Sequence, residues 1–194
     1  MKKYTVEVLG TFVLTLVVGL SLFNKFPVST PVLASLVIAL FVYTVGHVSG
    51  AYFNPALIVG AWSIKKIESR EMVLYILSQF VGAALALSII SFTVGVPSLF
   101  VSNNWVIIFA ECIGTLFFAF GVASIIYKKT PNDLSGIIAG GSLLLGITIA
   151  VLIGSNGVLN PALALGIGSF NLGYILAPIV GAVAGMQMYK YLAV

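Results

Sequence analysis

The tripeptide Asn-Pro-Ala occurs twice in the sequence, once as Asn54, Pro55 and Ala56 and once as Asn160, Pro161 and Ala162. Asn is a preferred helix N-cap and Pro is favoured at the first helical position, so each copy predicts the start of a helix. An Asn that caps its helix through Oδ1 keeps an amide NH₂ as a donor, beside the partial positive charge of the helix N-terminus. Two such sites can bind the oxygen atom of water or of a hydroxyl compound.

The composition places these motifs in a membrane. Of the 194 residues, 60% are hydrophobic and 7% are charged, whereas a soluble domain has about 25% charged residues. These values exclude a soluble enzyme, a nucleic-acid binder and a disordered chain. The sequence has no HExxH motif, no phosphate-binding GxxxxGKS or GxxxxGKT motif and a single cysteine, Cys112. We therefore expect no catalytic site, no metal site and no cofactor.

Six segments are long and apolar enough to cross a bilayer, which takes about 20 residues per helix. They are Tyr4–Phe23, Pro31–Val48, Met72–Phe92, Asn104–Tyr127, Leu134–Ile153 and Leu172–Leu192. Two further apolar stretches, Asn54–Ile64 and Asn160–Phe170, begin at the Asn-Pro-Ala motifs and are too short to cross. The sequence therefore predicts an all-α membrane protein, in which residues 1–194 form a single domain of six transmembrane helices and two re-entrant half-helices.

The basic residues predict the orientation of the chain. With six spans, eight of the nine Lys and Arg residues fall on one side of the membrane: Lys2, Lys3, Lys65, Lys66, Arg70, Lys128, Lys129 and Lys190. Lys25 falls on the other side. The positive-inside rule then places both termini in the cytoplasm.

The two halves of the chain repeat similar blocks in the same order. Residues 7–11 match residues 111–115, residues 54–57 match residues 160–163, and residues 81–83 match residues 180–182. Repeat one (about 1–95) and repeat two (about 104–194) each hold three spans. Because three is an odd number, the second repeat enters the membrane from the opposite side, as in many transport proteins. The two half-helices would then meet head to head near the midplane.

Irregular backbone is tolerated inside a membrane where it lines a water-filled cavity. The segments before the half-helices are Gly50, Ala51, Tyr52 and Phe53 in one repeat and Asn156, Gly157, Val158 and Leu159 in the other. Their carbonyls can act as acceptors along the same path. Since facing half-helix dipoles repel protons and other cations, we predict a passive pore for neutral polar molecules.

Three segments resemble signatures of the aquaporins, the major intrinsic protein family. They are His47-Val48-Ser49-Gly50-Ala51-Tyr52-Phe53-Asn54-Pro55-Ala56, Gln79-Phe80-Val81-Gly82-Ala83 and Pro178-Ile179-Val180-Gly181-Ala182. The resemblance covers essentially the whole chain. It implies a right-handed six-helix bundle with two half-helices, assembled as a homotetramer with one pore per subunit in the lipid bilayer of the plasma (inner) membrane. It also implies a channel for water, for small uncharged solutes such as glycerol, or for both.

Leu163 departs from the family pattern. Members usually carry Arg directly after the second Asn-Pro-Ala, as part of an outer constriction, and counting back from the motifs places the other constriction positions at Ala34, Thr148 and Gly157. These small, neutral residues predict a wide or relocated constriction with little polar selectivity. If neighbouring side chains collapse into it, a dewetted apolar gate results. Asn156 stands where the family usually has Gly, and Asn tolerates a left-handed backbone.

Glu7, Glu111 and His47 each have two interpretations. A carboxylate inside a span costs about 2.5–3.5 kcal/mol or more, so Glu7 and Glu111 could relay protons in a coupled secondary transporter. Alternatively they accept hydrogen bonds from the irregular loops, the role that the resemblance favours. His47 could gate the pore by protonation or support the first loop, and we favour support. A further alternative is a closed, non-conducting scaffold in which Leu163 blocks the pore.

Overall fold

The computed structural model describes residues 1–23, 26–95 and 104–194, and the only regular elements among them are helices. Six have the length and hydropathy of membrane spans: α1 (Lys2–Phe23), α2 (Thr30–Ser49), α4 (Ser69–Val94), α5 (Trp105–Ile126), α6 (Ser135–Ile153) and α8 (Leu172–Ala193). Two short helices, α3 (Pro55–Ser63) and α7 (Pro161–Gly166), follow the Asn-Pro-Ala motifs, and a 3-10 turn, η1 (Asn132–Leu134), precedes α6. The predicted all-α fold with six spans is confirmed.

The helix ends differ little from the sequence prediction. The largest difference among the spans is in α4, which begins at Ser69 rather than Met72. The half-helix α7 ends at Gly166, before the predicted end at Phe170. It stops there because the backbone soon turns left-handed at Gly168, where φ is +72°. Lys25, the basic residue predicted to lie on the opposite side, is outside the described residues.

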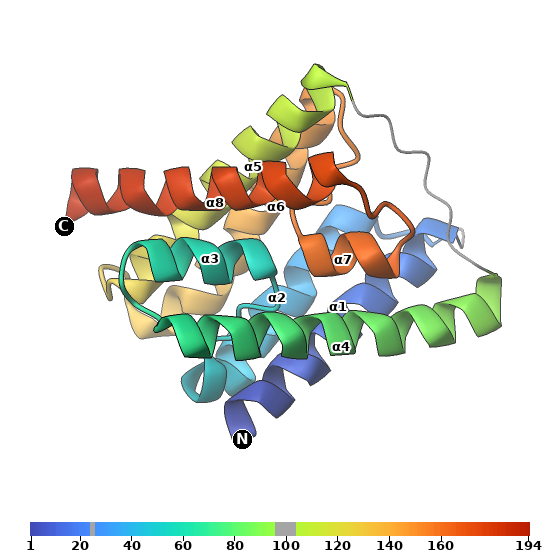
Figure 1. The fold of residues 1–194 in the computed structure, drawn as a ribbon, viewed down its shortest axis with the longest axis horizontal. Coiled ribbons are helices and arrows are strands. Elements are labelled where there is room, and N and C mark those ends of the chain that lie inside the picture. The colour runs from blue at the N-terminus through green and yellow to red at the C-terminus, as the bar shows by residue number, and fades with distance from the viewer. Residues whose placement is uncertain (24–25, 96–103) are drawn as a thin grey trace.

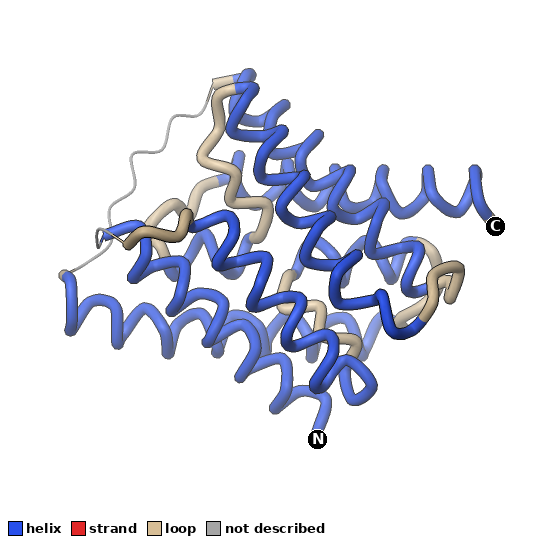
Figure 2. The backbone as a smooth tube through the Cα atoms, turned by 180° about the vertical axis from the view of Figure 1, so that it is seen from behind, coloured by secondary structure: helices blue, strands red, loops and turns tan. Residues whose placement is uncertain are grey.

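The packing of the helices is matched between the two halves of the chain. Helix α1 packs against α4 as α5 packs against α8, α1 contacts α2 as α5 contacts α6, and α3 contacts α8 as α7 contacts α4. The half-helices α3 and α7 lie end to end between the longer helices (Figure 1). The non-helical segments before them run inward between the helices (Figure 2). These matched pairs support the predicted inverted repeat.

Glycines bring the paired helices into backbone contact. A Cβ atom on Gly82 of α4 would overlap the carbonyl oxygen of Val8 in α1, and a Cβ atom on Gly181 of α8 would overlap the carbonyl oxygen of Cys112 in α5. The second contact is the repeat-related copy of the first. Small residues serve this purpose in membranes, because van der Waals packing rather than the hydrophobic effect holds helices together there.

We expect Gly181→Ala to destabilise the protein by about 1–3 kcal/mol, the usual cost of overpacking a filled interface. Its matched control is Gly141→Ala, because a Cβ atom there meets no atom within 4 Å. Ala is the better helix former by roughly 0.5–1 kcal/mol, so the control should be neutral or slightly stabilising. Thermal melts of the detergent-solubilised variants measure both effects, and equal melting temperatures would contradict the proposed helix contact.

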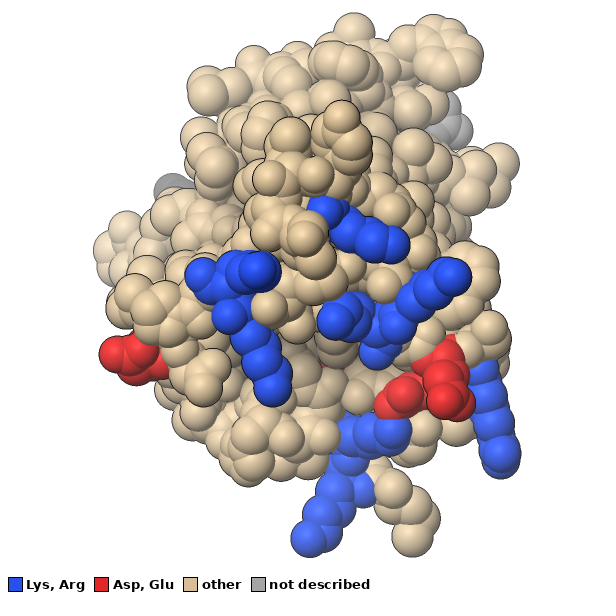
Figure 3. All heavy atoms as spheres, turned by 90° about the vertical axis from the view of Figure 1, so that its left-hand side faces the viewer, with Lys and Arg blue, Asp and Glu red and all other residues tan. Residues whose placement is uncertain are grey.

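Basic side chains gather over one end of the bundle (Figure 3). Lys65 and Lys66 follow α3, Lys128 and Lys129 follow α5, and Lys190 lies near the end of α8. We call this end of the molecule the basic end. The clustering agrees with the charge distribution from which the orientation was predicted.

Candidate functional site

The two Asn-Pro-Ala motifs cap α3 and α7 in the same way. Asn54 and Asn160 have nearly identical extended backbones, with φ and ψ of −152° and 115° for Asn54 and −151° and 111° for Asn160. Asn54 Oδ1 accepts a hydrogen bond from the Ala56 N–H at 2.9 Å, and Asn160 Oδ1 accepts one from the Ala162 N–H at 3.0 Å. Asn54 thus satisfies one of the N–H groups that a helix start leaves unpaired, and Asn160 satisfies two, because its Oδ1 also accepts from the Leu163 N–H at 3.3 Å.

The Asn amide nitrogens link the two repeats. Asn54 Nδ2 donates to the carbonyl oxygen of Leu159 at 2.9 Å, and Asn160 Nδ2 donates to the carbonyl oxygen of Phe53 at 2.9 Å. Each NH₂ group, predicted to be a donor to the pore, thus uses one of its two N–H groups to bind the other repeat, and one N–H remains for a solute. Phe53 and Leu159, whose carbonyls were also predicted to face the pore, accept these Asn amides instead, and neither residue lines the cavities described below.

The first irregular loop is held by Glu7, which is fully buried. Its carboxylate accepts four hydrogen bonds of 2.8–3.1 Å, from Ser49 Oγ, Tyr52 N, Phe53 N and Gln79 Nε2. Buried carboxylates need such partners because water cannot reach them. The loop-supporting interpretation of Glu7 therefore agrees with its geometry, since all its partners belong to the loop, α2 or α4.

Glu111 does the same for the second loop. It is fully buried and accepts hydrogen bonds from Ser155 Oγ, from Val158 N at 2.9 Å and from Leu159 N at 2.6 Å. Neither Glu111 nor Glu7 lies among the residues that line the cavities described below.

Both loops contain left-handed residues at matched positions. Ala51 and Phe53 have φ of +51° and +49°, and their repeat-related counterparts Gly157 and Leu159 have φ of +66° and +54°. A non-glycine residue in this region costs on the order of 1–3 kcal/mol and needs support from its surroundings; here the buried carboxylates hold the N–H groups of Phe53 and Leu159. Asn156 is not among the left-handed residues, so the reason given for its tolerance in the loop is wrong.

Three cavities lie end to end through the bundle. The basic-end cavity has a volume of about 720 Å³, the central cavity about 20 Å³ and the apolar-end cavity about 260 Å³. Tyr52 and Phe118 line both the basic-end and the central cavity, while Ala34 and Leu163 line both the central and the apolar-end cavity. We call the three cavities together the passage. Its central part holds about one water molecule.

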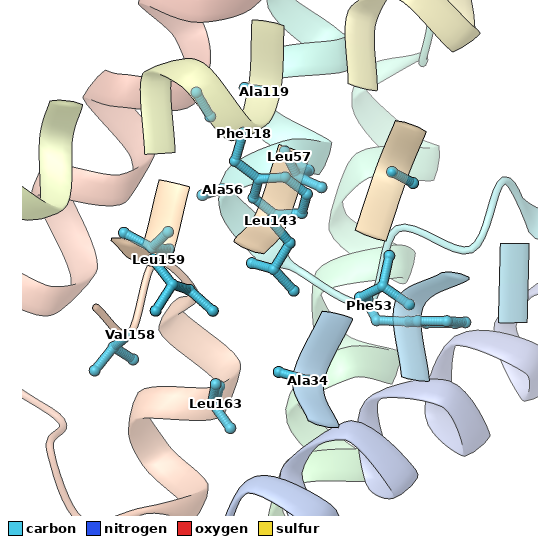
Figure 4. Close-up of a cluster of buried hydrophobic side chains, with 14 of the residues drawn as sticks. Ala34, Phe53, Ala56, Leu57, Phe118, Ala119, Leu143, Val158, Leu159 and Leu163 are labelled. Carbon is cyan, nitrogen blue, oxygen red and sulfur yellow. The ribbon is translucent and has the colours of Figure 1, made fainter. Parts of the chain in front are cut away.

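Both motif asparagines, Asn54 and Asn160, line the central cavity. Gly50, Ala51 and Tyr52 line the basic-end cavity, whereas Asn156, Gly157 and Val158 line the apolar-end cavity. Ala34, Leu143 and Leu163 point from three different elements toward a common space (Figure 4). Most of the pore residues predicted from the sequence therefore line the passage.

Thr148 was predicted to line the constriction, but it does not line the passage. It is exposed on the outer surface of the bundle, and its Oγ1 donates to the carbonyl oxygen of Leu144 in its own helix at 2.7 Å. Ile147 lines the central and apolar-end cavities instead. One residue along an α-helix turns a side chain by about 100°, so an error of one position in the count moves the side chain from the passage to the surface.

His47 has a different environment from the one expected. It is exposed and lines the basic-end cavity beside Lys66 and Lys128. Among the described residues it has no side-chain hydrogen-bond partner, so the prediction that it supports the loop is wrong. Ser49 and Gln79 bind Glu7 in its place.

The model of the major intrinsic protein family matches residues 1–191. The chain belongs to this family. It is 31% identical to the "Probable aquaporin AqpM" of Archaeoglobus fulgidus, over 99% of this chain and 97% of that protein. It is 30% identical to nodulin-26 of Glycine max, over 98% of this chain and 77% of that protein. An aquaglyceroporin of Plasmodium falciparum has the same fold, with a TM-score of 0.69, 19% identity and coverage of 98% of this chain and 94% of that chain.

Family membership sets the class of function. Major intrinsic proteins are integral membrane channels and not enzymes, and this chain is a passive channel for water or small uncharged solutes. The described residues contain no group of His, Cys, Asp and Glu that could hold a metal ion.

Proposed function

We propose that water and small uncharged solutes move down their gradients through the passage of each subunit. The observation that carries this proposal is the pair of asparagines, Asn54 and Asn160, which line the central cavity and whose amide nitrogens each make one hydrogen bond to the protein with one of their two N–H groups. A solute oxygen accepts from these donors as it crosses the narrowest part. On either side of them, Ala51 lines the basic-end cavity and Gly157 the apolar-end cavity.

Cations are excluded by the same arrangement. The N-termini of α3 and α7 face each other at the central cavity, and each carries a partial positive charge. A proton or other cation there meets two positive helix ends and two N–H donors, which is unfavourable in a low-dielectric site. Selection against charge therefore needs no Arg at position 163, where this chain has Leu163.

The carboxylates favour a channel over a proton-coupled transporter. A relay group must exchange protons with the transport path, but Glu7 and Glu111 are fully buried, hydrogen bonded to the loops and absent from the lining of the passage.

The proposal includes a single domain of two repeats, both termini and the basic end in the cytoplasm, and location in the plasma membrane. It also includes a homotetramer, in which exposed apolar faces such as those of Leu36 and Leu40 contact lipid or neighbouring subunits.

The test is light scattering of proteoliposomes after a sucrose jump and after a glycerol jump. We expect faster shrinkage in sucrose than in empty vesicles. Ala34→Trp fills the passage and should abolish the difference, whereas Ala84→Trp adds the same side chain on the exposed face of α4 and should not. Rates equal to those of empty vesicles would contradict the proposal, and uphill uptake driven by a pH gradient would favour the transporter.

A further inference from the structure

The two ends of the passage differ in polarity. The apolar-end cavity is lined by aliphatic side chains, among them Val18, Leu22, Ile147, Val151, Leu163 and Ile167. Polar and basic side chains line the basic-end cavity, among them His47, Lys66, Lys128, Asn132 and Ser135. A solute therefore gives up its water on the apolar side of the two asparagines.

The apolar-end cavity provides few replacement hydrogen bonds. Among the described residues that line it, only Thr30 and Asn156 have polar side chains, and each already has a protein partner: Thr30 Oγ1 accepts from Ser21 Oγ, and Asn156 Nδ2 donates to the Tyr174 hydroxyl. Where this cavity joins the central one, the shared lining is Ala34, Ile147, Val158 and Leu163. No side chain in that shared lining can donate or accept a hydrogen bond.

The difference in polarity arises from a difference between the two repeats, since the second repeat has an aliphatic residue where the first has a polar one. Tyr52 lines the passage on the basic side of the asparagines, and its repeat-related counterpart on the other side is Val158. A hydroxyl group that leaves water for such an apolar surface without a partner is penalised, whereas a methyl group is favoured there.

We propose that the passage selects small neutral molecules with few hydroxyl groups over polyols with the same carbon skeleton. Ile147 and Leu163 determine this specificity, because they supply aliphatic surface at the junction of the two cavities. This inference rests on the proposed function, and it defines the class of solute that the channel accepts.

The test compares 1,2-propanediol with glycerol, which differ by one hydroxyl group, as the permeant in proteoliposome re-swelling. After the empty-vesicle rates are subtracted, we expect the permeability to 1,2-propanediol to exceed that to glycerol by roughly 10- to 100-fold. An apolar site rejects an added hydroxyl by a factor of this order. A sucrose jump on the same vesicles reports water flux.

Two variants test the assigned residues. Ile147→Thr replaces the ethyl branch of the side chain with a hydroxyl, and Leu163→Gln adds a neutral donor and acceptor. Each should lower the propanediol-to-glycerol permeability ratio several-fold. Thr148→Val removes the neighbouring exposed hydroxyl and serves as the matched control, because Thr148 lies outside the passage. Size-exclusion elution at the wild-type volume identifies which of the two variants is folded.

The outcomes separate the two proposals. The specificity inference is overturned, and the channel proposal stands, if the protein conducts water but does not favour propanediol. This is the case when the propanediol-to-glycerol permeability ratio is near one or below one, or when neither solute passes. Absence of any protein-dependent flux, water included, overturns both. A high ratio that is unchanged in Ile147→Thr and Leu163→Gln overturns the assignment to these residues.

Discussion

Replacing Glu7 by Ala should leave a protein that no longer folds stably in detergent or lipid. The change removes the acceptor for four buried donors, and each buried donor left without a partner costs about 1–3 kcal/mol. The combined cost is comparable to the whole free energy of unfolding of an ordinary domain, about 5–15 kcal/mol. It also releases the left-handed backbone at Phe53 that the carboxylate holds.

Thermal melts and solute flux of Glu7→Ala and Glu7→Gln measure this effect. Gln keeps the shape and one acceptor oxygen but turns an NH₂ group toward donors, so its melting temperature should fall between those of wild type and Glu7→Ala. Glu111→Ala should behave like Glu7→Ala, because Glu111 holds the matched loop. A proton relay predicts otherwise: Glu7→Gln would keep wild-type stability and lose only pH-driven uptake.

Asn160→Asp should convert an uncharged passage into one that leaks protons or other cations. Asp is as good an N-cap as Asn, so the start of α7 should survive. The substitution replaces the amide that donates to the Phe53 carbonyl by a carboxylate, and the negative charge cancels the repulsion that the two helix ends exert on a cation. The wild-type channel should show no such leak, although it has Leu163 where the family pattern places Arg.

Proton flux into dye-loaded proteoliposomes under a potassium diffusion potential measures the leak. Asn104→Asp is the matched control, because Asn104 is also an N-cap, at α5, but is exposed and outside the passage. Proton flux in the wild type would show that the half-helix dipoles are insufficient. Equal, background-level flux in Asn160→Asp and Asn104→Asp would show that charge at this position does not control exclusion.

Local signals in the sequence were sufficient for the framework. The six spans follow from long apolar runs, and the starts of α3 and α7 follow from the capping preferences of Asn and Pro, which depend on neighbouring residues alone. The pairing of Glu7 with Glu111 follows from the repeat. The supporting role of these two carboxylates was favoured by the resemblance to the family and not by a local pattern.

Features that depend on packing between distant segments could not be predicted. Whether Ile147 or Thr148 faces the passage depends on the rotation of α6 about its axis. The constriction position in α6 was found by counting residues back from Asn160, and the loop between α6 and α7 makes that count uncertain by one residue. The contacts of Asn54 and Asn160 cross from one repeat to the other, so no local pattern indicates them. His47 lies one turn of helix from the loop that it was expected to support, but Ser49 and Gln79 donate to Glu7, the carboxylate that holds this loop.

The two hydrogen bonds that the Asn54 and Asn160 amides make between the repeats also affect how the protein folds during biosynthesis. During translation, the carbonyl of Phe53 and the amide of Asn54 are made more than a hundred residues before their partners, Asn160 and Leu159. Until the second repeat is made, the first repeat lacks the partners that these two groups have in the folded protein. The first half of the chain therefore becomes a finished structure only when the second half is inserted.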